Sequence, residues 1–360
     1  MEGLVLTTYW QGRSVFLTGH TGFMGGWLSA LLVERGARVS GYALAPESEP
    51  SFFSSTGLSG RIERSTIADV RDFDRLAEAI GEAEPEIVFH LAAQPLVRRA
   101  HAEPLETFST NVMGTANLLE AVRRSASVKA ALVVTTDKVY RNENRAEPYI
   151  EEDRLGGREP YSASKAACEL VADAWRHSYL RERGVGVATI RAGNIFGGGD
   201  WAADRLVPDA MRCFAAGRTL ELRHPEATRP WQHVLEPLPG YLTLAERLAT
   251  SPGEFAEAWN FGPALDSCRP VGEVAGLVAE AWGEGAEVRL GQVGGIFEET
   301  LLAIDSAKAH SRLGWEPRLS LEQAIARTVE WHRAHESGAD MWSATLQQIA
   351  DYDRLTRSAA

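Results

Sequence analysis

Residues 14–25 read SVFLTGHTGFMG, and this stretch decides the fold of the chain. Its first part, Ser14–Thr18, is a short apolar run typical of a buried strand, and the amphipathic stretch Trp27–Arg35 follows the glycines. Glycines at positions 19, 22 and 25 permit a tight turn and let a pyrophosphate approach backbone N–H groups at a helix N-terminus. A simple packing turn is the alternative, but the flanking strand and helix favour a dinucleotide site.

The alternation of strand and helix continues through the first half of the chain. Further apolar runs typical of strands lie at Arg38–Tyr42, Ile87–Ala92, Ala130–Thr135 and Val185–Ile190. Helical patterns lie at Asp72–Gly81, Pro104–Arg124 and Tyr161–Arg183. This order predicts an α/β fold of Rossmann type with a doubly wound parallel sheet. Two irregular segments, Ala45–Gly60 and Val139–Pro160, are expected at the carboxyl edge of the sheet, where such folds bind ligands.

The length of 360 residues is enough for about two domains. After Arg191 the alternation stops, and Pro, Gly and Trp become frequent. We therefore expect a dinucleotide-binding domain over residues 1–192 and about 230–260. A smaller C-terminal substrate-binding lobe is expected over about 193–229 and 261–360.

Net charge and cysteine content limit the kinds of ligand and partner that we expect for the chain. It carries 37 Lys and Arg against 49 Asp and Glu, a net charge of −12. This balance argues against a nucleic-acid partner, so an anionic ligand needs locally placed positive groups. Three widely spaced cysteines suggest neither a disulfide framework nor a zinc site, and no His, Asp and Glu cluster has metal-ligand spacing. Without a targeting signal or a long apolar run, we expect a cytoplasmic protein with no membrane partner.

Two groups of residues are candidates for catalysis. Tyr161 and Lys165 lie four residues apart in YSASK and so share one helical face, and a lysine ammonium beside a phenol favours the phenolate, which can act as a base. Thr136, Asp137 and Lys138 end a predicted strand and are expected at the same sheet edge. There a hydroxyl, an acid and an amine can exchange protons with a substrate. The alternative for both groups is an ordinary surface placement.

Other residues are candidates for binding. Arg205 and Arg229 can supply local positive charge because guanidinium groups bind phosphate bidentately, although arginines in surface turns are commonly only solvated. About 20 residues beyond the glycine turn, an acid would select NAD and an arginine NADP, but the chain has YAL at positions 42–44. These residues leave the choice of cofactor open. Asp69, followed by Val70, is a candidate for contact with the adenine or for a helix cap.

Longer motifs resemble those of a known superfamily, the extended short-chain dehydrogenases/reductases. They are TGHTGFMG (18–25), HLAAQ (90–94), YSASK (161–165) and RAGN (191–194). A second set resembles the NAD-dependent sugar-nucleotide 4,6-dehydratases of that superfamily, in their CDP-glucose branch. It comprises WQGRSVFLTGHTGF (10–23), TTDKVY (135–140), GGREPYSASK (156–165), RAGNIFGGGDWAADRLVPD (191–209), RPWQHVLEPLPGYL (229–242) and LGWEP (313–317).

The resemblance implies a tightly held NAD, a nucleotide-sugar substrate (CDP-glucose in this branch) and a 4-keto-6-deoxy sugar product. It implies that Tyr161, assisted by Lys165 and Thr136, takes the proton of the sugar 4-hydroxyl. Asp137 is then the acid toward the 6-hydroxyl, and Lys138 or a bound water removes the C5 proton. The implied cofactor contacts are Gly19, Thr21, Gly22, Phe23, Met24, Gly25, Asp69, Val70, Leu91, Ala92, Ala93, Gln94, Tyr161 and Lys165. The implied contacts of the nucleotide diphosphate are Asn194, Arg205 and Arg229.

The sequence departs from this branch at Met24, where a lysine is common, and in the region Ile296–Thr300. Three alternatives stay open: a 4,6-dehydratase of another nucleotide hexose or heptose, a nucleotide-sugar 4-epimerase, and a non-catalytic dinucleotide sensor. The Tyr161 and Lys165 pair favours an enzyme over a sensor. The resemblance also implies a homodimer or homotetramer, paired through helices at Pro104–Arg124 and Tyr161–Arg183.

Overall fold

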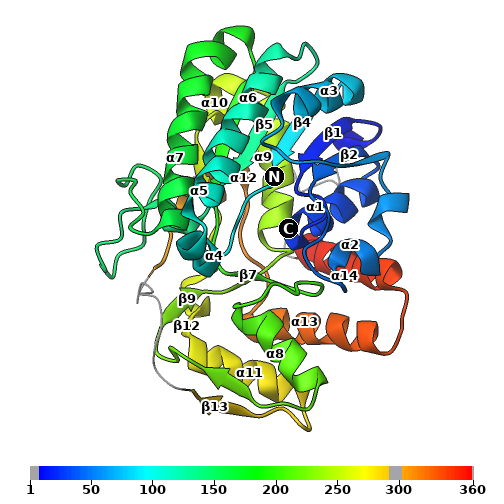
Figure 1. The fold of residues 1–360 in the computed structure, drawn as a ribbon, viewed down its shortest axis with the longest axis vertical. Helices are drawn as coiled ribbons and strands as arrows, with labels where there is room; N and C mark the ends of the chain where they lie inside the picture. Colours follow the sequence, from blue (N-terminus) through cyan, green and yellow to red (C-terminus); the bar gives the residue numbers. More distant parts are fainter. Residues whose placement is uncertain (1–7, 292–301, 359–360) are drawn as a thin grey trace.

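A sheet of seven parallel strands forms the centre of the molecule (Figure 1). The computed structural model describes residues 8–291 and 302–358, so Ile296–Thr300 and the first seven residues lie outside the described chain. From one edge to the other, the strands are β11 (Ala258–Asn260), β6 (Gly186–Arg191), β5 (Ala130–Val134), β4 (Ile87–His90), β1 (Ser14–Thr18), β2 (Arg38–Ala43) and β3 (Arg64–Ile67). The expected doubly wound α/β fold is confirmed.

β1 lies inside the sheet, and all five of its residues are buried. It pairs with β2 in the register Val15↔Val39 and with β4 in the register Val15↔Ile87. The chain order reverses here, because β2 leads to one edge of the sheet and β4 to the other. Such a switch point leaves a crevice at the carboxyl ends of the strands. β11, with three residues, is too short to be recognised from a periodic pattern.

Helices cover both faces of the sheet. One face packs against α3 (Phe73–Ala83), α6 (Gly114–Arg124) and α7 (Pro160–Trp175). The other packs against α1 (Phe23–Glu34) and α9 (Pro237–Thr250). Shorter helices are α2 (Phe52–Ser55), α4 (Val97–Ala102), α5 (Pro104–Phe108), α10 (Pro252–Phe255) and α12 (Ala307–Leu313). Among the helices of the described residues, none is both long and apolar enough to span a membrane.

α1 is buried on all sides rather than amphipathic, so that expectation is wrong. Every residue from Gly25 to Leu32 is buried. The side facing away from the sheet is covered by α14 (Met341–Ser358), and Arg35 binds both carboxylate oxygens of Asp353 at 2.6 and 2.7 Å. The C-terminal helix therefore completes the packing of the first helix, as Figure 1 shows.

A smaller group of elements lies below the carboxyl edge of the sheet in Figure 1. Its helices are α8 (Leu206–Ala215), α11 (Val271–Trp282) and α13 (Leu321–Glu336). Its strand pairs are β8 (Leu220–Leu222) with β13 (Val288–Leu290), and β9 (Thr228–Pro230) with β12 (Cys268–Pro270). β7 (Ile195–Phe196) pairs with β10 (Gln232–His233) beside them. These helices share a hydrophobic cluster of their own, while the domain boundaries given above stay a prediction.

Glu236, just before α9, joins three distant segments from a buried position. Its carboxylate accepts hydrogen bonds from the backbone N–H groups of Arg318 and Leu319 at 2.8 and 2.7 Å and from the Tyr352 hydroxyl at 3.0 Å. Burial raises the pKa of Glu236 from 4.5 to about 7 despite these donors. The folded protein therefore holds this proton more tightly than the unfolded chain does.

We predict that this group makes the protein less stable as pH rises from 4.5 toward 7. In that interval the unfolded chain ionises freely while the folded chain resists, at a cost of about 3 kcal/mol once both are ionised. Glu236→Gln does not titrate, so the unfolding free energy of wild type relative to this variant should fall across the interval. Urea unfolding at several pH values measures it, with the exposed Glu330→Gln as control. A difference that is constant with pH would contradict the prediction.

Candidate active site

A single cavity of about 610 Å³ opens at the carboxyl edge of the central sheet and reaches the smaller group of elements. Nearly every predicted site residue lines it. From the cofactor set these are Gly19, Thr21, Gly22, Phe23, Met24, Gly25, Asp69, Val70, Leu91, Ala92, Ala93, Tyr161 and Lys165. From the catalytic and substrate sets they are Thr136, Asp137, Lys138, Asn194, Arg205 and Arg229. The structure therefore brings together residues spread over more than half of the chain.

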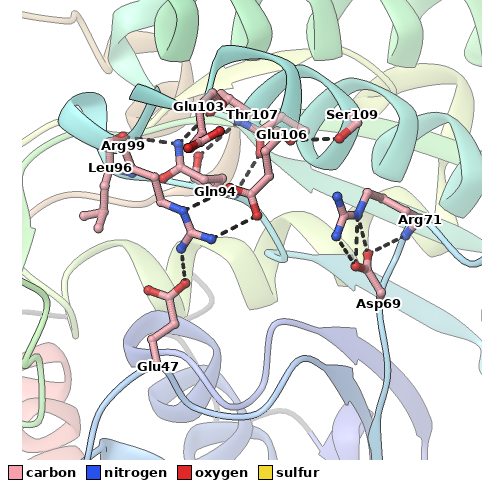
Figure 2. A network of polar contacts seen from close by, with 11 residues as sticks. Glu47, Asp69, Arg71, Gln94, Leu96, Arg99, Glu103, Glu106, Thr107 and Ser109 are labelled. Carbon is pink, nitrogen blue, oxygen red and sulfur yellow. Dashed lines mark hydrogen bonds and ion pairs between the residues drawn. The ribbon is translucent and has the colours of Figure 1, made fainter. Parts of the chain in front are cut away.

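Gln94 is the exception, because it is not among the residues that line the cavity. Its side chain is buried and accepts from the backbone N–H of Leu96 at 2.7 Å while donating to the Thr107 hydroxyl at 2.8 Å. Figure 2 shows these contacts around α4 and α5. These contacts hold the Gln94 side chain in the loop before α4, and its expected contact with the cofactor stays a prediction.

The glycine turn has the shape that a pyrophosphate needs. Gly19 has a φ of +85°, and a Cβ there would stand 2.8 Å from the backbone nitrogen of Ala92. At Gly25 a Cβ would stand 2.7 Å from the Gly19 carbonyl carbon and closer still to its oxygen. Gly22 begins α1 without a side-chain cap, so backbone N–H groups of the first turn remain for an anion. This part of the cavity fits a dinucleotide.

Asp69 lies farther along the cavity, at the end of the loop after β3. Arg71 binds its carboxylate through the side chain at 2.5 to 3.0 Å and through the backbone N–H at 2.9 Å (Figure 2). This hydrogen bonding holds the pKa of Asp69 below its usual value. The helix-cap alternative does not apply, because Asp72 caps α3 through the backbone N–H of Arg75. Asp69 is therefore an ionised, oriented acceptor beside the cavity.

An ion pair joins the segment after β2 to α4. Arg99 binds Glu47 at 2.5 Å and Glu106 at 2.9 and 3.1 Å, as Figure 2 shows. Glu47 lines the cavity, whereas Glu106 lies on α5. The irregular segment Ala45–Gly60 thus makes an exposed ion pair with α4, and it also contains the short helix α2.

α7 places Tyr161 and Lys165 in the cavity wall. Glu159 fixes the start of this helix, since its carboxylate accepts from the backbone N–H groups of Tyr161 and Ser162 at 2.7 and 2.6 Å. Lys165 donates to the Val134 carbonyl at 2.9 Å, and burial lowers its pKa. Burial raises the pKa of Tyr161 to about 12, with a hydrogen bond to Thr136 as the largest opposing effect. The positive charge that lowers the pKa of Tyr161 is that of Arg205, and burial outweighs it.

Asp137 is buried, and two threonines, Thr135 and Thr136, separate it from the end of β5. Its Oδ1 accepts a hydrogen bond from the Thr136 hydroxyl at 3.0 Å, and its Oδ2 is a buried atom without a hydrogen-bond partner among the described residues. Burial raises the pKa of Asp137, while the charges of Lys138 and Arg229 oppose that rise. A carboxyl in this environment keeps its proton to higher pH than usual and is suited to act as an acid.

Further polar donors line the same cavity, and the charges of Arg205 and Arg229 act on Tyr161 and Asp137, respectively. Arg205 binds Asp200 at 3.2 Å, and Arg229 donates to the Thr228 carbonyl at 3.0 Å. Asn194 has a φ of +44°, and its buried Nδ2 has no hydrogen-bond partner within the described chain. A buried amide donor of this kind requires an acceptor, and a ligand oxygen in the cavity would supply it.

Two supporting features were missed in the sequence. The helix expected over Pro104–Arg124 is interrupted by a π-helical turn at Ser109–Met113, where the Asn111 side chain donates to Ser164 at 2.9 Å and to the Gln94 carbonyl at 3.1 Å. Glu169 and Arg191 form a buried ion pair at 2.9 Å. Residue type and spacing do not predict these contacts, because each partner comes from a distant segment.

We predict that Gly25→Ala weakens NAD binding at the glycine turn. The new methyl group would overlap the Gly19 carbonyl, and such overpacking costs about 1–3 kcal/mol. Binding of NAD should weaken by about tenfold or more, measured by calorimetry or by the thermal shift that NAD produces. Gly81→Ala, at an exposed glycine of α3 where an added Cβ would meet nothing within 4 Å, is the control. Equal losses in both variants would contradict the steric explanation.

Comparisons with known proteins agree with this geometry. Over 353 residues, the chain is 46% identical to the CDP-glucose 4,6-dehydratase of Salmonella typhimurium, covering 97% of this chain and 98% of that protein. A UDP-glucose 4-epimerase from Thermotoga maritima has the same fold, with a TM-score of 0.78 and 24% identity over 89% of this chain and 99% of that one. A dTDP-glucose 4,6-dehydratase from Streptomyces venezuelae with NAD bound has a TM-score of 0.77 and 24% identity, over 91% and 99%. Residues 15–262 match the NAD dependent epimerase/dehydratase family, and the chain belongs to that family.

Proposed function

We propose that this protein converts CDP-glucose to CDP-4-keto-6-deoxyglucose and water with NAD as a recycled cofactor. One observation carries the proposal: Thr136, Asp137 and Lys138 share one cavity wall with Tyr161 and Lys165, next to the glycine turn. The cytidine nucleotide is proposed because the Salmonella relative, 46% identical over nearly the whole chain, is a CDP-glucose 4,6-dehydratase.

The first step that these residues support is loss of the proton of the sugar 4-hydroxyl to Tyr161. NAD, when bound, accepts the C4 hydride and later returns it to C6. Burial alone disfavours the Tyr161 phenolate, so positive charge near the phenol is needed for the tyrosine to act as a base. Arg205 supplies positive charge that acts on the phenol, Thr136 orients it, and Lys165, fixed on the Val134 carbonyl, is proposed to assist.

The second step is elimination of water across C5 and C6. The C5 proton leaves to a base, its bonding electrons form the C5–C6 double bond, and the C6–O bond breaks. Asp137 gives its proton to the departing 6-hydroxyl, which leaves as water. Lys138 or a bound water is the proposed base, and proton return to C5 accompanies hydride return to C6.

The remaining polar residues are proposed to hold the nucleotide diphosphate. Asn194 offers its buried amide donor, and Arg205 and Arg229 offer guanidinium groups, in the same cavity that the glycine turn lines. Charge-assisted hydrogen bonds of this kind bind phosphate strongly.

We predict turnover of CDP-glucose without added reductant. The 4-keto product is detected by its absorbance in base, and a screen of CDP-, dTDP-, UDP- and GDP-hexoses identifies the nucleotide. CDP-glucose should give the highest kcat/KM. If none of the four nucleotide hexoses gave a keto product, the proposed activity would be wrong. If another nucleotide hexose gave a higher kcat/KM, that compound would replace CDP-glucose as the proposed substrate.

We predict that Asp137→Asn lowers dehydration by about 100-fold or more, because the amide has no proton to give to the 6-hydroxyl. A 4-epimerase needs the hydride step but no elimination, so retained sugar conversion in this variant would favour that activity. Asp173→Asn, which changes an exposed acid of α7, is the matched control. Product analysis by mass spectrometry separates dehydrated from isomerised sugar.

We also propose that two copies of the chain pair through α5, the π-helical turn and α7. Large apolar side chains are exposed there, with Leu105 85% and Leu170 65% exposed, accompanied by Met113 and Phe108. Monomeric proteins rarely expose such a group of apolar side chains on neighbouring helices, and a face of this kind is self-complementary in a two-fold dimer.

We predict that Leu105→Glu combined with Leu170→Glu yields the mass of a single chain in light scattering, whereas wild type has twice that mass. Two carboxylates buried at a closed interface would remain unpaired and prevent association. Leu290→Glu, at an exposed leucine of β13, should not change the mass. A wild-type mass of four chains would require a second interface.

A further inference from the structure

Gly193, two residues beyond β6, lies against the carboxyl group of Asp137. A Cβ at this position would stand 2.5 Å from the Oδ1 atom of Asp137 and closer still to Cγ and Oδ2. The three nearest atoms thus all belong to one carboxyl group. The backbone at Gly193 is not in the left-handed region, so its conformation would accept other residues. Glycine is required here by the neighbouring carboxyl group.

The carboxyl group is held in this place from two sides. The backbone N–H of Asp137 donates to the Ala192 carbonyl at 3.1 Å, which ties the acid to the residue before Gly193. The Thr136 hydroxyl donates to Oδ1 at 3.0 Å. Asp137 is only 1% exposed, so a methyl group at position 193 could be accommodated only by moving this carboxyl group from its present place.

Oδ2 is the oxygen of the Asp137 carboxyl group that remains without a hydrogen-bond partner. It is buried and has no hydrogen-bond partner among the described residues, although Asp137 and Gly193 both line the cavity. An unsatisfied buried oxygen is costly, and it persists when the surrounding structure fixes it for a ligand. Because Gly193 has no side chain, this oxygen can occupy its position beside the backbone of residue 193.

We propose that Gly193 is a positioning residue for Asp137: its missing side chain makes room for the carboxyl group and keeps Oδ2 available to the substrate. The inference rests on the proposed function and deepens it. We expect the larger effect on water elimination, which uses the Asp137 carboxyl group directly, whereas Tyr161 and Lys165, which serve the oxidation step, stand on a different element, α7.

Gly193→Ala tests this directly. The new methyl group forces the carboxyl group away from Thr136, and a misplaced acid can cost on the order of 100-fold in rate. We expect dehydration to fall by about that factor. Addition of CDP-glucose to the NAD-loaded variant should still produce the near-ultraviolet absorbance of reduced nicotinamide, because oxidation at C4 does not use Asp137. Unchanged dehydration, or equal loss of oxidation and dehydration, would overturn the proposal.

A double-mutant cycle separates positioning from general damage to the fold. Asp137→Ala removes all three atoms that a Cβ at position 193 would meet. Gly193→Ala should therefore lower the thermal unfolding midpoint of wild type but not that of Asp137→Ala. An equal drop in both backgrounds would overturn the proposal, because the methyl group would then clash with something else. Gly276→Ala, at an exposed glycine of α11 with open space around it, is the control and should lower neither midpoint.

The cycle also distinguishes the two proposals. Wild-type protein that consumes none of the four nucleotide hexoses would overturn the proposed function alone. The unfolding midpoints need no substrate, and they would still decide whether Gly193 makes room for the Asp137 carboxyl group.

Discussion

The buried pair of Glu169 and Arg191 is the interaction on which the active-site edge depends. Glu169 projects from α7 and also accepts hydrogen bonds from Thr135 and Thr189, each at 2.6 Å. Arg191, the last residue of β6, donates in addition to the Tyr140 hydroxyl and to the Glu151 carbonyl, each at 2.9 Å. One ion pair thus joins β5, β6, α7 and the long segment between β5 and α7.

The catalytic groups lie at or near the ends of these same elements. Asp137 follows β5, Gly193 follows β6 and Tyr161 lies on α7, so a small rotation of any one element would separate them. Burying two charges is expensive, and the pair is stable because its hydrogen bonds satisfy both partners. The arrangement illustrates how a buried polar network can specify geometry at a functional site, even where it adds little to stability.

The acidic character of the chain is compatible with anionic ligands because each phosphate region has its own local donors. The glycine turn offers uncharged backbone N–H groups and the N-terminus of α1, whereas Asn194, Arg205 and Arg229 offer side-chain donors in the same cavity. The net charge of −12 therefore describes the surface as a whole and says little about the cavity. Met24, a departure from the related sequences, lies in the first region, where backbone donors rather than side-chain charge face the cavity.

Much of this organisation follows from short-range patterns. The run Ser14–Thr18 with its glycines determined a central strand, a turn and a helix, because local sterics and the apolar period act within a few residues. The motifs around Tyr161 and Asp137 determined which chemical groups are present. What only the tertiary structure decided is how distant segments meet: α14 covering α1, the π-helical turn that presents Asn111, the burial that raises the pKa of Tyr161, and the fit of Gly193 against Asp137. These depend on packing between residues far apart in the chain, and packing leaves no periodic signal in a single sequence.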